Sequence, residues 1–333
     1  MRIAIDAMGG DHGPAMTVAG ALLAAKEWND AHIVLVGDEA LITPHLPAGG
    51  APSNVTIHHA SDVIAGDDEP VRAVRRKKDA SMVVCGRLIR EGAADAMISA
   101  GNTGALMATG LLIVGRIDGI ERPALAPMLP TMDGSGFLAL DLGANMDSTE
   151  HNLLQYAIMG SVYRNKVHGI SKPRVGLLNV GTEAGKGNEL TKAAFPLLEQ
   201  APIHFVGNVE ARDLLHGSCD VLVCDGFAGN ILLKAMEGTA GAVFKALKTE
   251  FTRSFISKLA AAILKPGLTA FKQKMDYTEH GAAPLLGIDG LVLKCHGSSD
   301  SNAFKNAVRQ ARIAHTSGLV GAISSETSRK RDG

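Results

Sequence analysis

The chain of 333 residues is long for a single domain, for which roughly 100–200 residues is usual. Its length suits one large α/β domain or two fused lobes that share a sheet. Hydrophobic residues make up 46% of the sequence and charged residues 20%, so a sizeable core can be buried. The formal net charge of −1 provides no overall attraction to nucleic acid or to an acidic membrane. We therefore expect no nucleic-acid partner, and any membrane contact must use a local patch.

Short β-branched runs alternate with longer alanine-rich segments, a pattern typical of a largely parallel sheet covered by helices. In chain order, the predicted strands are 2–6, 32–37, 55–59, 96–99, 137–141, 174–179, 205–206, 221–224 and 291–293. The predicted helices are 14–27, 71–91, 104–114, 149–163, 188–198, 210–215, 230–249, 254–264 and 301–317. We expect residues 1–323 to form a single α/β catalytic domain with an αβα sandwich. The polar residues 324–333 predict a disordered tail.

The beginning of the chain reads directly as a strand rather than as a signal peptide. No apolar run approaches the roughly 18 residues of a membrane span. The four cysteines show neither metal-site spacing nor a CxxC pair, and three of them lie in apolar runs, which favours buried, reduced thiols. We expect the protein to be cytoplasmic.

Glycine and small polar residues follow the predicted strands with unusual regularity. The loops are 6–11, 99–104, 141–145, 179–183, 225–230 and 296–300. Ligands of open α/β sheets bind beyond the carboxyl ends of the strands, and a helix N-terminus attracts anions. Each loop alone could be only a turn with a helix cap, but six in succession favour a site for a phosphate-sized anion. The candidate substrate-binding residues are Gly101, Asn102, Thr103, Gly104, Asn145, Gly229 and Ser298.

Neither the GxGxxG fingerprint nor the P-loop pattern occurs in these loops, so we expect no nucleotide cofactor. No cluster of aspartates is placed to hold a divalent ion, so we expect no metal. Lys186, flanked by Gly185 and Gly187, could reach an anion or could be a solvated loop lysine. Asn230 could be a plain helix cap or could direct its amide into a cleft.

Several long motifs occur in one order along the chain: MRIAIDAMGGDHGP, EPVRAVRRKK, SAGNTGALM, DLGAN, GLLNVGTEAGKGNELTK, GNVEARDLL, DGFAGN and HGSSDSNA. Together they closely resemble the bacterial phosphate acyltransferases, from Met1 to about Ser317. The resemblance implies that acyl carrier protein (ACP), carrying an acyl thioester, and inorganic phosphate are converted to acyl-phosphate and free ACP for phospholipid synthesis. It also implies a homodimer with a fold similar to the isocitrate and isopropylmalate dehydrogenases and the phosphotransacetylases.

The same resemblance implies catalytic roles for Lys186 and Asn230, which match a lysine of the family's KGNEL segment and the asparagine of its DGFxGN motif. Gly185 departs from relatives that carry a second lysine there. We expect backbone N–H groups of the 101–104 and 143–145 loops, with Lys186, to hold phosphate, while Asn230, or a backbone N–H beside it, stabilises the oxyanion. The competing mechanism passes through an acyl-cysteine. None of the four cysteines stands in a glycine loop beside an obvious base, although Cys295 immediately precedes His296. His12 and His296 are each at least as consistent with structural hydrogen bonding as with catalysis.

Residues 244–275 combine an apolar helical face with many basic side chains, and Pro266-Gly267 predicts a break that makes a hairpin of about 240–276. The face could be core, a dimer interface or a basic-flanked membrane surface, and the resemblance favours the last two together. The basic run 72–78 is either a solvated helix face or a docking patch for acidic ACP. Two alternative functions remain: a phosphotransacetylase-like enzyme that uses acyl-CoA, and a non-catalytic phosphate or fatty-acid sensor.

Overall fold

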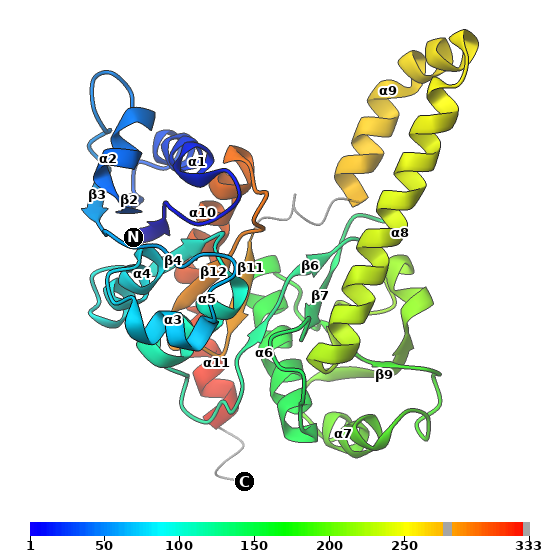
Figure 1. Ribbon diagram of the computed structural model, residues 1–333. Helices are drawn as coiled ribbons and strands as arrows, with labels where there is room; N and C mark the ends of the chain where they lie inside the picture. The colour runs from blue at the N-terminus through cyan, green and yellow to red at the C-terminus, as the bar shows by residue number, and fades with distance from the viewer. Residues whose placement is uncertain (276–281, 329–333) are drawn as a thin grey trace.

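The computed structural model describes residues 1–275 and 282–328, which build two sheets surrounded by helices (Figure 1). One sheet has the strand order β3-β2-β1-β4-β12-β11-β5, and the other has the order β6-β7-β10-β8-β9. Neighbouring strands are parallel except around β11 and β6, which pair antiparallel with their neighbours. This arrangement confirms an α/β fold with largely parallel pairing, in two sheets.

The strands of the first sheet are β1 Arg2–Asp6, β2 His32–Gly37, β3 Val55–His59, β4 Ala96–Ser99, β5 Ala124–Leu125, β11 Ala283–Leu286 and β12 Leu291–Lys294. Those of the second are β6 Met128–Leu129, β7 Phe137–Leu140, β8 Arg174–Asn179, β9 His204–Glu210 and β10 Val221–Val223. The helices are α1 Gly13–Glu27, α2 Glu39–Ile42, α3 Pro70–Arg76, α4 Ser81–Arg90, α5 Thr103–Thr109, α6 Glu150–His168, α7 Glu189–Glu199, α8 Gly226–Thr252, α9 Phe255–Met275, α10 Ser301–Thr316 and α11 Leu319–Ser328. Shorter helical turns are η1 Thr43–His45, η2 Gly110–Val114 (a π-helix) and η3 Ala211–His216.

The central strands of the first sheet, β1, β4 and β12, are buried on both faces, which explains why they are largely apolar along their length. In β1, Ile3 and Ile5 join a core cluster with residues of α1 and α10. Between them, Ala4 points to the opposite face and belongs to a second cluster with α3, α4 and α5. Successive residues of a strand thus supply alternate layers of the fold.

The second sheet has the same construction, with α6 on one face and α8 and η3 on the other. Leu140 and Val221 share a cluster with Tyr156 of α6, whereas Ala139 and Leu222 belong to the cluster on the other face. The cluster that includes α6 also contains the α10 face of the first sheet. One continuous core therefore joins the two sheets and fixes the positions of their strand ends relative to one another.

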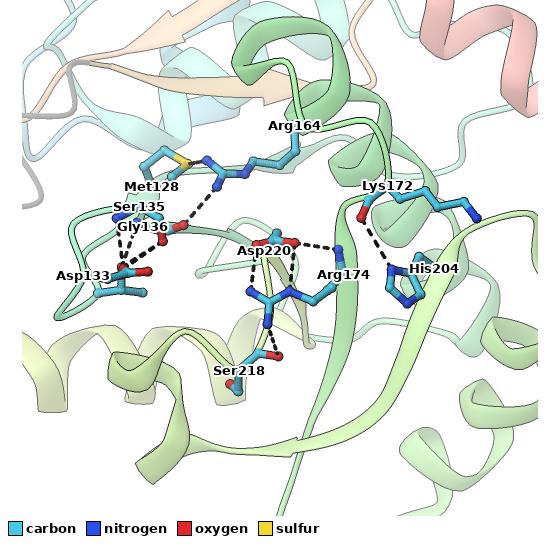
Figure 2. A network of polar contacts seen from close by, with 11 residues as sticks. Met128, Asp133, Ser135, Gly136, Arg164, Lys172, Arg174, His204, Ser218 and Asp220 are labelled. Carbon is cyan, nitrogen blue, oxygen red and sulfur yellow. Dashed lines mark hydrogen bonds and ion pairs between the residues drawn. The ribbon is translucent and has the colours of Figure 1, made fainter.

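A polar network ties together the amino ends of the second sheet's strands, at the opposite edge from the loops described below (Figure 2). Asp220 precedes β10 and accepts hydrogen bonds from the Arg174 backbone at 2.7 Å and from its guanidinium Nη2 at 3.0 Å. Buried Arg164 of α6 donates to the carbonyl of Gly136 at 3.0 Å. We assign this network to stability, since it joins α6, β7, β8 and β10.

Several predicted boundaries differ from the structure. The helix predicted at 71–91 is two helices, α3 and α4, and the ammonium of Lys77 between them donates to Val63 and Asp68. Residues 324–328 continue α11, where we expected a disordered tail, and 329–333 lie outside the described residues.

Helices α8 and α9 form a hairpin that projects from the rest of the molecule (Figure 1). Its turn lies at residues 253–254, between the two helices, and not at Pro266-Gly267 as predicted, because α9 runs through Pro266. Phe244 and Phe271 pack across the hairpin, with ring centroids 6.0 Å apart. Other members of the apolar face are exposed, which contradicts a core role for it. Within the described residues, no helix is long and apolar enough to cross a membrane.

Candidate active site

A cleft of about 370 Å³ lies where loops from the carboxyl ends of both sheets meet. Its polar lining comprises Thr103, Asn230, Lys234, Glu237, Lys294 and His296. Its apolar lining includes Leu125, Pro127, Met128, Leu142 and Leu233. A cleft with one apolar side and a few polar groups can hold an acyl chain beside a small anion.

The 101–104 loop is positioned by the carboxylate of Asp6, at the end of β1. Asp6 is buried and accepts hydrogen bonds from the hydroxyls of Ser81 and Ser99, both at 2.6 Å. Burial raises the pKa of Asp6, while these hydrogen bonds oppose the shift. The Ser99 hydroxyl oxygen also accepts the N–H of Gly101 at 3.0 Å, so the first buried strand fixes the loop that follows β4.

Within that loop, Asn102 caps α5. Its side-chain oxygen accepts the N–H of Ala105 at 3.0 Å, and its amide donates to the carbonyl of Gly66 at 2.9 Å. Gly104 packs against Pro70 at the start of α3. Asn102 thus has a structural role in this state, and Thr103 is the residue of the loop that lines the cleft.

A second buried carboxylate, Asp141, shapes the loop after β7. It accepts the N–H groups of Ala144 at 3.1 Å and Asn145 at 2.6 Å, and also the Asn145 side-chain amide at 3.0 Å. Burial raises the pKa of Asp141, and these three donors counteract that shift. Asn145 is therefore held by Asp141, and Gly143 is the part of this loop that reaches the cleft together with Leu142.

Asn230 lies in the first turns of α8, on the wall of the cleft. The helix begins at Gly226, and its cap is Asp225, whose carboxylate accepts the N–H of Ala228 at 2.9 Å. The prediction that α8 begins at residue 230 is therefore wrong, and Asn230 is not its cap. In the described ranges the Asn230 amide makes no hydrogen bond, so it remains available to a ligand.

Close backbone packing holds Asn230 against the 143–145 loop. A Cβ atom on Gly229 would lie 2.0 Å from the carbonyl oxygen of Asp141, and one on Gly226 would lie 2.4 Å from that of Asn145. A Cβ atom on Gly143 would lie 3.4 Å from Cγ of Asn230. Gly229 therefore acts through the backbone, since only a residue without a side chain lets α8 approach the end of β7 so closely.

The end of β12 supplies Lys294, Cys295 and His296 to the lining. The Lys294 ammonium donates to the carbonyls of Ala100, at 3.4 Å, and Cys295. Ser298 lies beyond the lining, and its hydroxyl is 2.7 Å from Nδ1 of His296. Lys294 was not among the predicted site residues, although a lysine at the end of an apolar strand just before a glycine-serine loop is an unusual pattern.

Lys186 lies on the exposed loop after β8 and is absent from the cleft lining. Its backbone is held by neighbours: the N–H donates to the carbonyl of Glu183 at 3.0 Å, and the carbonyl accepts the Asn179 amide at 3.1 Å. Because β8 and β10 are parallel neighbours, the loop after β8 and the segment after β10 that leads to Asn230 lie at the same end of the sheet. Its catalytic role stays a prediction.

All four cysteines are buried and unpaired by disulfides. Cys295 reaches the cleft, yet burial raises the pKa of its thiol to about 12. The same cause raises the pKa of Cys219 to about 12 and that of Cys224 well above its ordinary value. Since the thiolate is the nucleophilic form, this state of the molecule disfavours an acyl-cysteine route.

Solved structures with the same fold include a phosphotransacetylase from Streptococcus pyogenes, with a TM-score of 0.62 and 16% sequence identity over 95% of this chain and 94% of that one. A branched-chain phosphotransacylase from Enterococcus faecalis has a TM-score of 0.58 and 15% identity over 95% and 99%. A putative 4-hydroxythreonine-4-phosphate dehydrogenase from Salmonella typhimurium has a TM-score of 0.53 and 14% identity over 94% and 98%. The fold is thus one shared by phosphotransacetylases and dehydrogenases.

Sequence comparison defines the family. A family model described as "fatty acid synthesis protein" matches residues 1–320. A phosphate acyltransferase from Brevibacillus brevis is 63% identical over 311 residues, 93% of this chain and 92% of that protein. One from Geobacillus is 60% identical over 323 residues, 97% of both chains. The chain belongs to this phosphate acyltransferase family and is an acyltransferase.

Proposed function

We propose that the enzyme makes acyl-phosphate from acyl-ACP and inorganic phosphate, as the first step of phospholipid synthesis. The observation that carries this proposal is the Asn230 amide, which has no partner in the described ranges and lines a cleft with an apolar side. The names of the close relatives support phosphate as the acyl acceptor. No cofactor is required, because a thioester is already activated.

In the proposed reaction, a phosphate oxygen attacks the thioester carbonyl carbon and forms a tetrahedral oxyanion. The C–S bond then breaks, the thiolate leaves on ACP, and the new C–O bond remains in acyl-phosphate. Asn230 donates a hydrogen bond to the oxyanion, while Thr103 and backbone N–H groups of residues 102–104 help to hold phosphate. Holding both reactants in an attack geometry can supply up to roughly 7–11 kcal/mol.

Lys186 is proposed to contribute a positive charge to the phosphate when its loop approaches the cleft. Lys186→Ala should lower kcat/KM for phosphate by about 10- to 100-fold, because hydrogen bonds to charged groups contribute about 1.5–3 kcal/mol. Lys192→Ala removes another exposed lysine, on α7, and serves as the matched control. Equal phosphate kinetics in the two variants would remove Lys186 from the mechanism.

The function itself is tested by incubating the purified protein with phosphate and either palmitoyl-ACP or palmitoyl-CoA. We expect acyl-phosphate and free ACP thiol to appear together with the first donor. Turnover only with the second donor would identify a phosphotransacetylase-like enzyme. Saturable phosphate or palmitate binding without turnover of either donor would identify a sensor.

The hairpin of α8 and α9 is proposed to bring the cytoplasmic enzyme to an anionic membrane surface and to contact a second copy in a homodimer. Phe255 is 83% exposed, Ile256 80% and Ile263 74%, an unusual concentration of bare apolar side chains. Lys258 and Lys265 lie on the same helix and supply positive charge. Apolar contact combined with basic flanks is what interfacial binding requires.

Phe255→Glu should weaken binding to vesicles of phosphatidylglycerol and phosphatidylethanolamine by about tenfold or more, since burying a phenylalanine contributes about 1.5–3 kcal/mol. Thr249→Glu, at an exposed polar position of α8, adds the same charge without removing an apolar contact. Flotation measures the vesicle binding, and sedimentation measures the oligomeric state. Unchanged flotation of Phe255→Glu with loss of the dimer would assign the face to the second copy alone.

A further inference from the structure

The cleft is lined, among the described residues, by two lysines in very different electrostatic surroundings. Lys234 forms an ion pair with Glu237, with Nζ 2.9 Å from the carboxylate. Lys294 forms no ion pair with any Asp or Glu in residues 1–275 and 282–328, and it donates to the carbonyls of Ala100 and Cys295. Of the two cations, only Lys234 is neutralised.

The position of Lys294 is energetically costly without a counter-ion. The side chain is half-buried at the end of a buried strand, and this burial lowers the pKa of its ammonium. The carboxylates of Asp6 and Asp11 act on it from a longer distance, and Asp6 is already engaged by two serine hydroxyls. A partly desolvated cation of this kind gains more from an incoming anion than an exposed lysine does.

The two walls of the cleft come from different sheets, and each wall carries different polar groups. Lys294 and Thr103 come from the ends of β12 and β4, which are neighbours in the first sheet. Asn230 and Gly143 come from the second sheet. The first wall of the cleft is thus formed by the first sheet and the second wall by the second sheet. An anion bound at the first wall therefore lies across the cleft from the free amide of Asn230.

We infer that Lys294 is a phosphate-binding residue, which holds the nucleophile at the first wall while Asn230 serves the thioester carbonyl at the second. This inference rests on the proposed function for the identity of the nucleophile. Phosphate supplies the counter-ion that Lys294 lacks, and the ammonium in turn holds one phosphate oxygen in place for attack. Lys186 then contributes from outside the lining, as a second and more distant charge.

Lys294→Met keeps the apolar stem and removes the charge. We expect the KM for inorganic phosphate to rise about tenfold or more, while the KM for acyl-ACP changes less than about twofold. Lys294→Arg keeps a positive charge and should raise the phosphate KM less than methionine does. Lys166→Met removes an exposed lysine of α6 that does not line the cleft, and it controls for the loss of one positive charge.

Inorganic phosphate alone provides a second measurement, through the rise in Tm that it causes by binding the folded state. The rise should be present in the wild type and Lys166→Met, and largely absent in Lys294→Met. An undiminished rise together with an unchanged phosphate KM would overturn the inference, even if the enzyme makes acyl-phosphate. Equal increases in both KM values would also overturn it, since Lys294 would then only support the cleft. If the wild type makes no acyl-phosphate, the proposed function fails, and phosphate binding still decides the role of Lys294.

Discussion

Replacing Asn230 with alanine should lower kcat by about 100- to 1000-fold, the loss of about 2.7–4 kcal/mol that removal of one oxyanion donor typically causes. The reason is the position of its amide, which lines the cleft and makes no hydrogen bond in the described part of the chain. Since the contact forms mainly in the transition state, KM for acyl-ACP should change little. Steady-state release of ACP thiol measures both quantities.

Ile231→Ala is the matched control, because Ile231 is the next residue of α8, is exposed, and is absent from the cleft lining. It should keep turnover close to that of the wild type. The assignment of Asn230 would be wrong if both variants turned over at the wild-type rate. A fall in kcat for Ile231→Ala as large as that for Asn230→Ala would show a general disturbance of α8.

Gly229→Ala should both destabilise the fold and nearly abolish activity. The new Cβ atom would lie 2.0 Å from the carbonyl oxygen of Asp141 and 2.9 Å from Sγ of Cys224. The first of these is backbone, so α8 must move away from β7, and Asn230 moves with it. Overpacking costs typically about 1–3 kcal/mol, and we expect the upper end because a side-chain rearrangement cannot relieve this clash.

The control for this change lies in the same helix. A Cβ atom on Gly238 meets nothing within 4 Å, so Gly238→Ala should stabilise the protein slightly, by about 0.5–1 kcal/mol. Urea unfolding compares the two variants with the wild type. If Gly229→Ala unfolded at the wild-type midpoint and kept its turnover, the close approach of α8 to β7 would not be needed for the site.

The sequence predicted the carboxyl-end loops well, because parallel strands in the middle of a sheet are short apolar runs followed directly by polar turns. The predicted bounds of β1, β2, β3, β4 and β8 are those of the structure. Strands β5, β6 and β11 were missed, since they have only two to four residues and pair antiparallel in the tertiary fold. The local sequence pattern carries little information about such short strands. Two of them nevertheless contribute to the cleft, through Leu125 of β5 and Met128 of β6.

The candidate site shows the same division between local and tertiary information. Asn230 and Thr103 were predicted, and both line the cleft. Asn102 and Asn145 were predicted as ligands, but in the structure each is held by hydrogen bonds within the protein. Lys294 was missed because its importance comes from the absence of a described acidic partner, which only the assembled cleft reveals.

The position of the turn in the α8–α9 hairpin was also predicted wrongly from the sequence. Pro266 and Gly267 suggested a break, yet α9 continues through them and the chain turns at 253–254. A proline inside a helix removes one backbone hydrogen bond and crowds the carbonyl four residues earlier, so it predicts a break that α9 does not make. Residue 276, the last of the predicted hairpin, lies outside the described residues.

Direct attack of phosphate on the thioester, with no acyl-enzyme before it, is the core of the proposed mechanism. It is tested most directly by mixing excess enzyme with palmitoyl-ACP and following free ACP thiol, first without phosphate and then after phosphate is added. We expect no thiol release in the first phase, and then one thiol for each molecule of acyl-phosphate formed. Release of one thiol per enzyme before phosphate is added would contradict it, because the acyl group would then have moved to a residue such as Cys295.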